Sequence, residues 1–215
     1  MGAAPYAERA PVSSTPALFG KVMWLVALTV GFATLGVYAA REAGGGLWFI
    51  AWIAALGCLV GLNVASSRGN QTLALVLLFV FGLLIGASVS ATINYYSQTD
   101  PTAVRQAFGA TALFVAGLGS AGYAIRTDLS FLYRFLFFAL IGLIVAGIVL
   151  LFVHMQHAYT VYAVFGLVIF GGYTIVDFNR LRRAGQDEAI PLAAGIFIDV
   201  LNIFLFFLQI FGRNN

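Results

Sequence analysis

Two apolar stretches near the carboxyl end decide the fold, and each carries one aspartate. Residues 166–178 read GLVIFGGYTIVDF, and residues 191–212 read PLAAGIFIDVLNIFLFFLQIFG. Asp177 lies near the end of the first stretch and Asp199 lies within the second. An ionisable side chain inside an apolar span is costly, which makes it a candidate functional residue by default. The rest of the sequence indicates what these two aspartates do.

The composition is that of an integral membrane protein. The chain has 215 residues, of which 61% are hydrophobic and 9% charged, and its mean hydropathy is +0.97. Soluble domains carry roughly 25% charged residues. The net charge is +3 and the isoelectric point is about 9.2, but the basic residues lie in the connections or near the ends of the apolar runs. We therefore relate them to membrane topology rather than to nucleic acid, for which we find no motif.

Apolar runs of about 20 residues, long enough to cross a bilayer as a helix, recur along the chain. They predict seven spans: residues 20–40, 47–66, 71–94, 103–125, 131–153, 159–179 and 190–211. We expect an all-α fold with a single seven-helix transmembrane domain over residues 20–212. Residues 1–19 are expected to form a flexible cytoplasmic tail. No connection is long enough to hold a soluble domain.

The arginines and lysines are unequally divided between the two sides of the predicted bundle. The side of the amino terminus has Arg9, Lys21, Arg68, Arg126, Arg134, Arg180, Arg182 and Arg183, and the other side has Arg41, Arg105 and Arg213. Because cytoplasmic loops carry the excess of basic residues, we expect the amino terminus in the cytoplasm and the carboxyl terminus outside. The short tail and the compact length favour the inner (plasma) membrane of a bacterium.

Small residues repeat every four positions along the predicted third span, at Gly82, Gly86 and Ser90, and Asn94 continues their face. Such a stripe is typical of close packing between transmembrane helices. A face that lines an aqueous path is the alternative. The single cysteine, Cys58, lies in an apolar run, where we expect it to be a packed small residue.

The two aspartates are expected to lie at similar depth. The midpoint between Asp177 and Asp199 is residue 188, inside the polar turn that follows the sixth span. A helical hairpin bent at this turn places both carboxylates a few turns from the cytoplasmic surface. Other polar residues share their helix faces: Tyr173 and Thr174 precede Asp177, and Asn202 and Gln209 follow Asp199. A polar stripe of this kind on the last helix predicts that this helix faces the inside of the bundle.

Two carboxylates close together in a medium of low dielectric constant cannot both ionise cheaply. We expect Asp177 and Asp199 to share a proton and to titrate as one coupled pair, which makes them a pH sensor. Loss of the shared proton would favour separation of the last two helices. It would also favour a cation, either an arginine or Ca²⁺, which prefers oxygen ligands. Arg68 is the candidate partner on topological grounds; a simple positive-inside anchor is the alternative for it. For the aspartates, the alternative is two independent protonated residues that serve packing alone.

The carboxyl-terminal half resembles the Bax inhibitor-1 family, the transmembrane Bax inhibitor motif proteins, in its small bacterial form. The matching pieces are YAIRTDLSFLYRFLFFALIGLI at residues 123–144, the glycine- and tyrosine-rich helix that carries Asp177, and IDVLNIFLFFLQIF at residues 198–211. The likeness is strong over residues 105–212 and consistent with the rest of the chain.

This resemblance implies a fold in which six helices surround a central C-terminal helix. It also implies a pH-sensitive calcium leak gated by a pair of aspartates, matched here by Asp177 and Asp199, with transient Ca²⁺ binding between them. Arg68 is the nearest match to the arginine that bonds the pair in the closed state of the family. One departure is Phe178, which stands where members of the family commonly have threonine. Expected partners are the lipid bilayer, calcium ions as the transported species, and membrane proteins.

Three rival functions are weaker or differ in kind. An intramembrane aspartyl protease needs Tyr-Asp and Gly-x-Gly-Asp patterns, whereas Val176 and Ile198 precede the aspartates here. His154 and His157 have the spacing of a metal clamp but no third ligand nearby in sequence. We find no phosphate-binding loop and no nucleophile with its base, so we expect neither an enzyme nor a bound cofactor.

The serious alternative to a calcium leak is a regulatory protein that binds a membrane protease or a cell-death factor without obligatory ion conduction.

Overall fold

The computed structural model describes residues 15–42, 46–152 and 158–212, and within these ranges the chain forms α-helices, one short 3₁₀ helix and no strand. The helices are α1 (Thr15–Ala39), α2 (Leu47–Ser67), α3 (Gln71–Thr99), α4 (Pro101–Ala124), α5 (Leu132–Phe152), α6 (Ala158–Leu181), the 3₁₀ helix η1 (Gln186–Glu188) and α7 (Ala189–Phe211). All seven α-helices are long and apolar enough to cross a membrane. The predicted all-α membrane fold with seven spans is confirmed.

The predicted spans differ from the helices mainly at two ends. α1 begins at Thr15, so residues 15–19, which we assigned to the tail, belong to the helix. α3 continues to Thr99 rather than residue 94, because its polar last turn bonds to its own backbone: the Thr99 hydroxyl donates to the Tyr95 carbonyl oxygen at 2.8 Å. The next helix starts at once, since the Asp100 carboxylate accepts from the Ala103 N–H at 2.9 Å and Pro101 occupies the first helical position.

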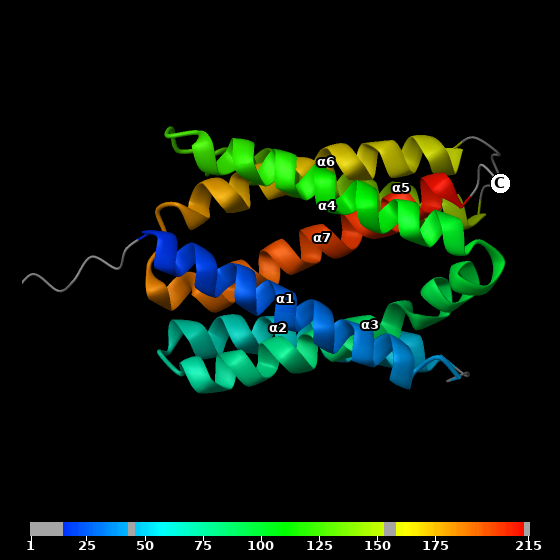
Figure 1. Ribbon diagram of the computed structural model, residues 1–215, viewed down its shortest axis with the longest axis horizontal. Helices are drawn as coiled ribbons and strands as arrows, with labels where there is room; N and C mark the ends of the chain where they lie inside the picture. Colours follow the sequence, from blue (N-terminus) through cyan, green and yellow to red (C-terminus); the bar gives the residue numbers. More distant parts are fainter. Residues whose placement is uncertain (1–14, 43–45, 153–157, 213–215) are drawn as a thin grey trace, which may run out of the picture.

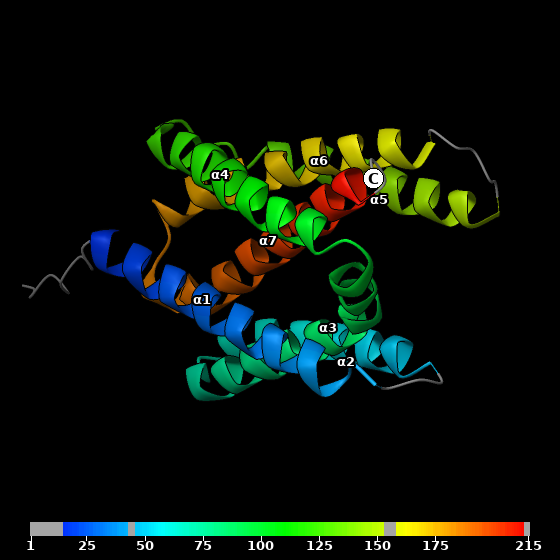
Figure 2. The same ribbon diagram turned by 45° about the vertical axis from the view of Figure 1, so that its right-hand side comes forward.

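The helices form two groups with α7 between them. In Figure 1, α1, α2 and α3 lie on one side, α4, α5 and α6 lie on the other, and α7 runs obliquely across the middle; Figure 2 shows the same division from a second angle. α7 packs against α1, α2, α3, α4 and α6. α5 packs chiefly against α6 and is the least buried of the spans. In the described residues α7 is thus the central helix, with α5 set outside the ring of its neighbours.

Large apolar side chains around most of its circumference explain why α7 is central. Phe197, Ile203 and Leu208 are almost fully buried, and Phe81 of α3 meets Phe197 edge-on with ring centroids 5.8 Å apart. A helix that is apolar on all sides is buried when it can be, because each neighbour adds packing. The other spans keep one apolar face outward, for the bilayer.

The small residues of α3 pack closely against α1, which confirms the first of the two interpretations. A Cβ atom added at Gly86 would collide with the backbone carbonyl of Ala33, and one added at Gly82 would lie 2.8 Å from the Thr29 methyl group. The Ser90 hydroxyl donates within α3 to the Ala87 carbonyl at 2.8 Å and lies 3.4 Å from the Ala40 carbonyl of α1. The stripe lets the two backbones approach closely.

Polar contacts join the connections at the end of the bundle where η1 lies, which we call the η1 end. The buried Asn179 amide nitrogen donates to the carbonyls of Ile125 and Thr127 at 2.8 and 3.1 Å, and so fixes the connection between α4 and α5 to the end of α6. Arg183 and Asp128 form an ion pair at 2.7 Å. The hydrogen bond from Arg183 lowers the pKa of the exposed Asp128 carboxyl below its usual range.

Candidate functional site

A cavity of about 290 Å³ lies between α5, α6 and α7 and contains both aspartates. Its lining residues are Tyr133 and Leu140 of α5, Phe170, Tyr173, Asp177 and Arg180 of α6, and Pro191, Leu192, Gly195, Ile198 and Asp199 of α7. The hairpin of α6 and α7 brings together two carboxylates that are 22 residues apart (199 − 177) in the sequence. The rest of its lining is largely apolar.

Asp177 is held by a tyrosine from the neighbouring helix. Its side chain is buried, with 7% of the residue exposed, and the Tyr133 hydroxyl donates a hydrogen bond to its Oδ1 atom. Tyr133 stands at the beginning of α5, 44 residues before Asp177. A hydroxyl that donates to a carboxylate favours the ionised form of that carboxylate, whereas burial opposes it. Asp177 is therefore set between two opposing influences.

Asp199 lacks such a donor. It is 4% exposed, and its Oδ2 atom is buried without a hydrogen-bond partner among the described residues. A buried carboxylate oxygen without a donor is costly if the group is ionised. The oxygen therefore calls for a proton on the carboxyl group, a water molecule or a cation in the cavity. Asp199 Oδ2 is therefore the atom of the site that most clearly lacks an interaction partner in the described part of the chain.

Gly195 lets the carboxylate of α6 approach α7. It lies one helical turn before Asp199, and a Cβ atom added at this position would lie 2.7 Å from Asp177 Oδ2. The hydrogen atom of glycine is thus the largest substituent that fits without displacing the Asp177 carboxylate. No hydrogen bond joins the two carboxylates in the described part of the chain, but both line the same cavity.

Arg180 is the positively charged side chain in the lining of the cavity. It follows Asp177 by three residues, on the same face of α6, and it lines the cavity. Its Nε atom donates to Glu188 Oε2 at 3.0 Å, and its Nη2 atom bonds to the same oxygen. Arg180 therefore stands between the buried aspartates and the polar turn at the η1 end, paired with an acid of that turn.

Of the other predicted site residues, only Tyr173 lines the cavity, where its ring lies 6.1 Å from that of Tyr133. The Thr174 hydroxyl and the Asn202 amide donate to their own helices, at the carbonyls of Phe170 and Ile198, both at 2.9 Å. They support helix geometry rather than the cavity. Arg68, at the C-terminal end of α2, is exposed and makes no bond to either aspartate in the described part of the chain. Its role as their partner stays a prediction.

The remaining residues singled out by the sequence lie elsewhere. Phe178 is buried on a different face of α6 and does not line the aspartate cavity; its ring packs 6.3 Å from Phe19. The departure from the family pattern at this position therefore does not alter the walls of the cavity. Cys58 is a half-buried free thiol. His154 and His157 fall outside the described residues. No group of three or more histidine, cysteine, aspartate or glutamate side chains gathers within the described ranges.

Sequence comparison identifies the relatives of this chain. A membrane protein of Vibrio cholerae is 30% identical over 165 residues, which cover 76% of this chain and 73% of that protein. One from Streptococcus pyogenes is 31% identical over 73% of this chain and 71% of its own length. A protein of Chlamydia muridarum is 28% identical over 97% of this chain and 94% of its own length. All three are described as uncharacterised proteins.

The model of the family described as Inhibitor of apoptosis-promoting Bax1 matches residues 15–215. The matched region includes all seven helices and therefore both walls of the aspartate cavity that α6 and α7 supply. The chain belongs to this family, the Bax inhibitor-1 family of membrane proteins.

Proposed function

We propose that this protein is a pH-sensitive calcium leak channel of the membrane, controlled by Asp177 and Asp199 acting as one titrating site. The observation that carries the proposal is the single cavity that both buried carboxylates line, with Asp199 Oδ2 left without a donor. An acidic cavity of this kind holds a proton at low pH and attracts a cation once the proton is lost.

The charged and titratable groups around the pair come from three helices. Tyr133 faces Asp177 from α5, Tyr173 and Arg180 lie on α6, and Asp199 lies on α7. Arg180 is partly neutralised by Glu188, so one cation faces two carboxylates. When both carboxylates are ionised, their repulsion exceeds what this arginine offsets. The helices that carry them then separate or admit Ca²⁺, and the protonation state of the pair sets which arrangement dominates.

Weak, transient binding of Ca²⁺ suits a leak. Ca²⁺ takes 6–8 oxygen ligands in stable sites, whereas the cavity offers two carboxylates and the tyrosine hydroxyls. The ion would keep part of its hydration shell and leave readily. Conduction requires such a balance, because an ion that binds too tightly does not pass on.

Calcium flux in vesicles that contain the purified protein tests this proposal. Flux should change with pH in the wild type, and Asp177→Asn and Asp199→Asn should each flatten that dependence because neither variant can form the titrating pair. Asn202→Ala, on α7 but outside the cavity, is the matched control and should keep the wild-type profile. The absence of flux at every pH would refute the channel and favour a regulatory protein. An unchanged pH profile in both variants would refute the sensor.

The proposal includes a location. The relatives named above are bacterial proteins, which supports the bacterial inner membrane. The described basic residues gather at the η1 end, with Lys21, Arg68, Arg126, Arg134, Arg180, Arg182 and Arg183, against Arg41 and Arg105 at the other end. By the positive-inside rule we place the η1 end and the amino terminus in the cytoplasm and the carboxyl terminus outside.

A further inference from the structure

A second cavity system, unrelated to the aspartates, lies between α1 and α4. α1 packs against α3 and α7, and α4 packs against α6 and α7, so the space between α1 and α4 is left open above α7. A cavity of about 710 Å³ fills it toward the η1 end, and one of about 290 Å³ continues it toward the other end. Thr111 of α4 and Val200 of α7 line both. We call this continuous feature the α1–α4 groove.

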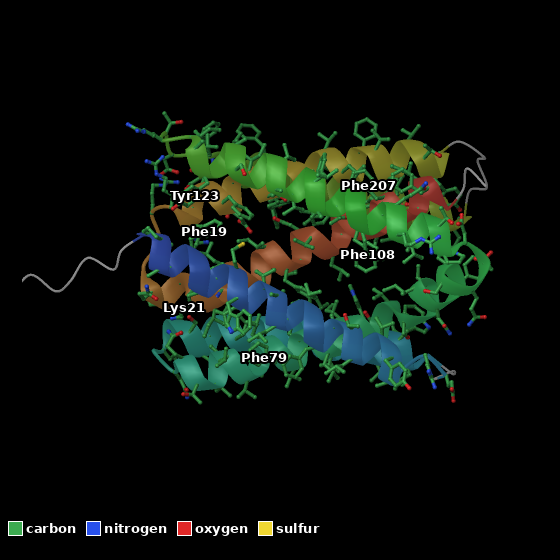
Figure 3. All side chains as sticks on the ribbon, in the orientation of Figure 1. Phe19, Lys21, Phe79, Phe108, Tyr123 and Phe207 are labelled. Atoms are coloured by element: carbon green, nitrogen blue, oxygen red, sulfur yellow. The ribbon has the colours of Figure 1, made fainter. Side chains whose placement is uncertain are left out.

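The groove is apolar and faces sideways out of the bundle. Its walls include Phe19 and Met23 of α1, Val115 and Ala116 of α4, and Phe178 of α6. Figure 3 shows Phe19 and Tyr123 meeting across it near one end and Phe108 beside it farther along; the rings of Phe19 and Tyr123 are 5.3 Å apart. The Thr111 hydroxyl donates to Ala107 within its own helix at 2.7 Å, so it offers no free donor to a polar occupant.

Two arginines, Arg182 and Arg126, lie at the end of the groove nearest to η1. Arg182 Nη1 lies 3.5 and 3.4 Å from the carbonyl oxygens of Tyr123 and Ala124, two residues of the groove wall. This contact engages one of its two terminal nitrogens and leaves other N–H groups of the guanidinium for a further acceptor. Arg126 is exposed two residues beyond Ala124. Two acids at this end are paired, Asp128 with Arg183 and Glu188 with Arg180, whereas the exposed Asp187 of η1 forms no ion pair within the described residues.

We propose that the α1–α4 groove binds a phospholipid, with an acyl chain along the groove and the headgroup phosphate at Arg182 and Arg126. The groove runs along spans that cross the bilayer, so hydrocarbon chains are the apolar material next to it. Its volume lies within the range of about 300–1,000 Å³ usual for ligand sites. A guanidinium suits a phosphate because its fork of N–H groups matches the phosphate oxygens. An apolar groove with arginines at one end matches a ligand that has an apolar chain and an anionic headgroup.

Photo-cross-linking in the membrane tests this site. The full-length protein is reconstituted in vesicles with phosphatidylglycerol that carries a diazirine in one acyl chain, and the labelled peptides are mapped by mass spectrometry. We expect labels on the groove-lining parts of α1 and α4. Ala116→Phe, which fills the groove, should lower this labelling several-fold. Gly117→Phe at the adjacent exposed position, which does not line the groove and where an added Cβ atom meets open space, should leave it unchanged.

The headgroup is tested separately. Arg182→Gln should reduce labelling by phosphatidylglycerol several-fold, whereas Arg105→Gln at the opposite end should not, and excess inorganic phosphate should not displace the lipid because the acyl chain supplies much of the affinity. If Ala116→Phe fails to elute as a monodisperse protein, Ala112→Leu in the same wall replaces it. Equal labelling on all faces of α4, no effect of either groove variant, or cross-links between two copies across the groove would each overturn the proposal.

Discussion

At the scale of single residues, Tyr133 is the group whose removal distinguishes a chemical role of the cavity from a structural one. Its hydroxyl donates to Asp177, and its ring forms part of the cavity wall. Tyr173 lines the same cavity without a hydrogen bond from its hydroxyl in the described residues. The two tyrosines therefore form a matched pair, because replacing either by phenylalanine keeps the ring and removes one hydroxyl.

We predict that Tyr133→Phe displaces the midpoint of pH-dependent calcium flux to higher pH. A hydrogen bond to a charged group contributes about 1.5–3 kcal/mol, so its loss makes ionisation of the aspartate pair harder. The midpoint should move by about one pH unit or more, since one unit corresponds to about 1.4 kcal/mol. Flux titrations of both variants provide the measurement, with Tyr173→Phe expected near the wild-type midpoint. Equal shifts in both variants would contradict a specific role for the Tyr133 hydroxyl.

The sequence predicted the two aspartates and Tyr173 of this site, but not Tyr133 or Arg180. The aspartates were recognisable because charge in an apolar span is rare, and their spacing about a polar turn indicated a common depth. Arg180 carried a usable signal, its position three residues after Asp177 on one helix face, but we interpreted it only as a basic residue at the cytoplasmic end of the span. Tyr133 carried none, since its meeting with Asp177 depends on how α5 is rotated and placed against α6. Arg68 was chosen by topology, which fixes an end of the bundle but not a distance.

At the scale of helices, close packing of α1 and α3 depends on the absence of a side chain at Gly86. A Cβ atom there would collide with the Ala33 carbonyl, which belongs to the backbone and cannot rotate away. Gly31, by contrast, lies on an open face of α1 with nothing near an added Cβ atom. Alanine therefore has opposite consequences at two glycines of one helix pair.

We predict that Gly86→Ala destabilises the folded protein by about 1–3 kcal/mol, the usual cost of overpacking, whereas Gly31→Ala is neutral or slightly stabilising, because glycine within a helix costs about 0.5–1 kcal/mol relative to alanine. Thermal unfolding of the purified variants in the same detergent, followed by far-UV circular dichroism, measures the difference. Equal melting temperatures for the two variants would show that the α1–α3 contact relaxes freely.

The connections at the η1 end include one ion pair with a defined pH dependence. Because Arg183 lowers the pKa of Asp128, this carboxyl stabilises the folded state at pH values above its ordinary pKa of about 3.9, and that contribution is lost as pH falls through the lowered value. We predict that Asp128→Asn has a lower melting temperature than the wild type at pH 7, and that the gap narrows below about pH 4. Glu42→Gln, an exposed carboxyl at the opposite end, serves as control. A gap that is the same at both pH values would show that the ion pair does not contribute.

At the scale of the whole molecule, the alternation of seven spans sets which residues share a side of the membrane. The lengths of the apolar runs were enough to predict that the helices exist and how many there are, because a helix needs about 20 apolar residues to cross a bilayer. The order of packing did not follow: the sequence indicated that α7 lies inside, but not that α5 lies outside its neighbours. The contribution of Asn179 was also missed, because a single amide that holds a distant loop has no periodic pattern.

We predict opposite locations for the two chain ends in a bacterial host. Alkaline phosphatase fused after Asn215 should be active, since it folds only outside the cytoplasm, whereas a fluorescent protein fused before Met1 should fluoresce in the cytoplasm. The basis is the gathering of basic residues at the η1 end. An inactive phosphatase together with a fluorescent carboxyl-terminal fusion would reverse the topology, or show that the number of spans is even.

The outlying position of α5 has a mechanical consequence for the aspartate cavity. Two of its walls, α6 and α7, belong to the buried core, whereas the third wall rests on its contact with α6 and on the hydrogen bond from Tyr133 to Asp177. Sliding α5 along the plane of the membrane would exchange protein contacts for lipid contacts of similar apolar character. Moving α5 therefore enlarges the cavity at a lower cost in packing energy than separating α6 from α7. The lipid beside α5 then contributes to the free energy of this movement.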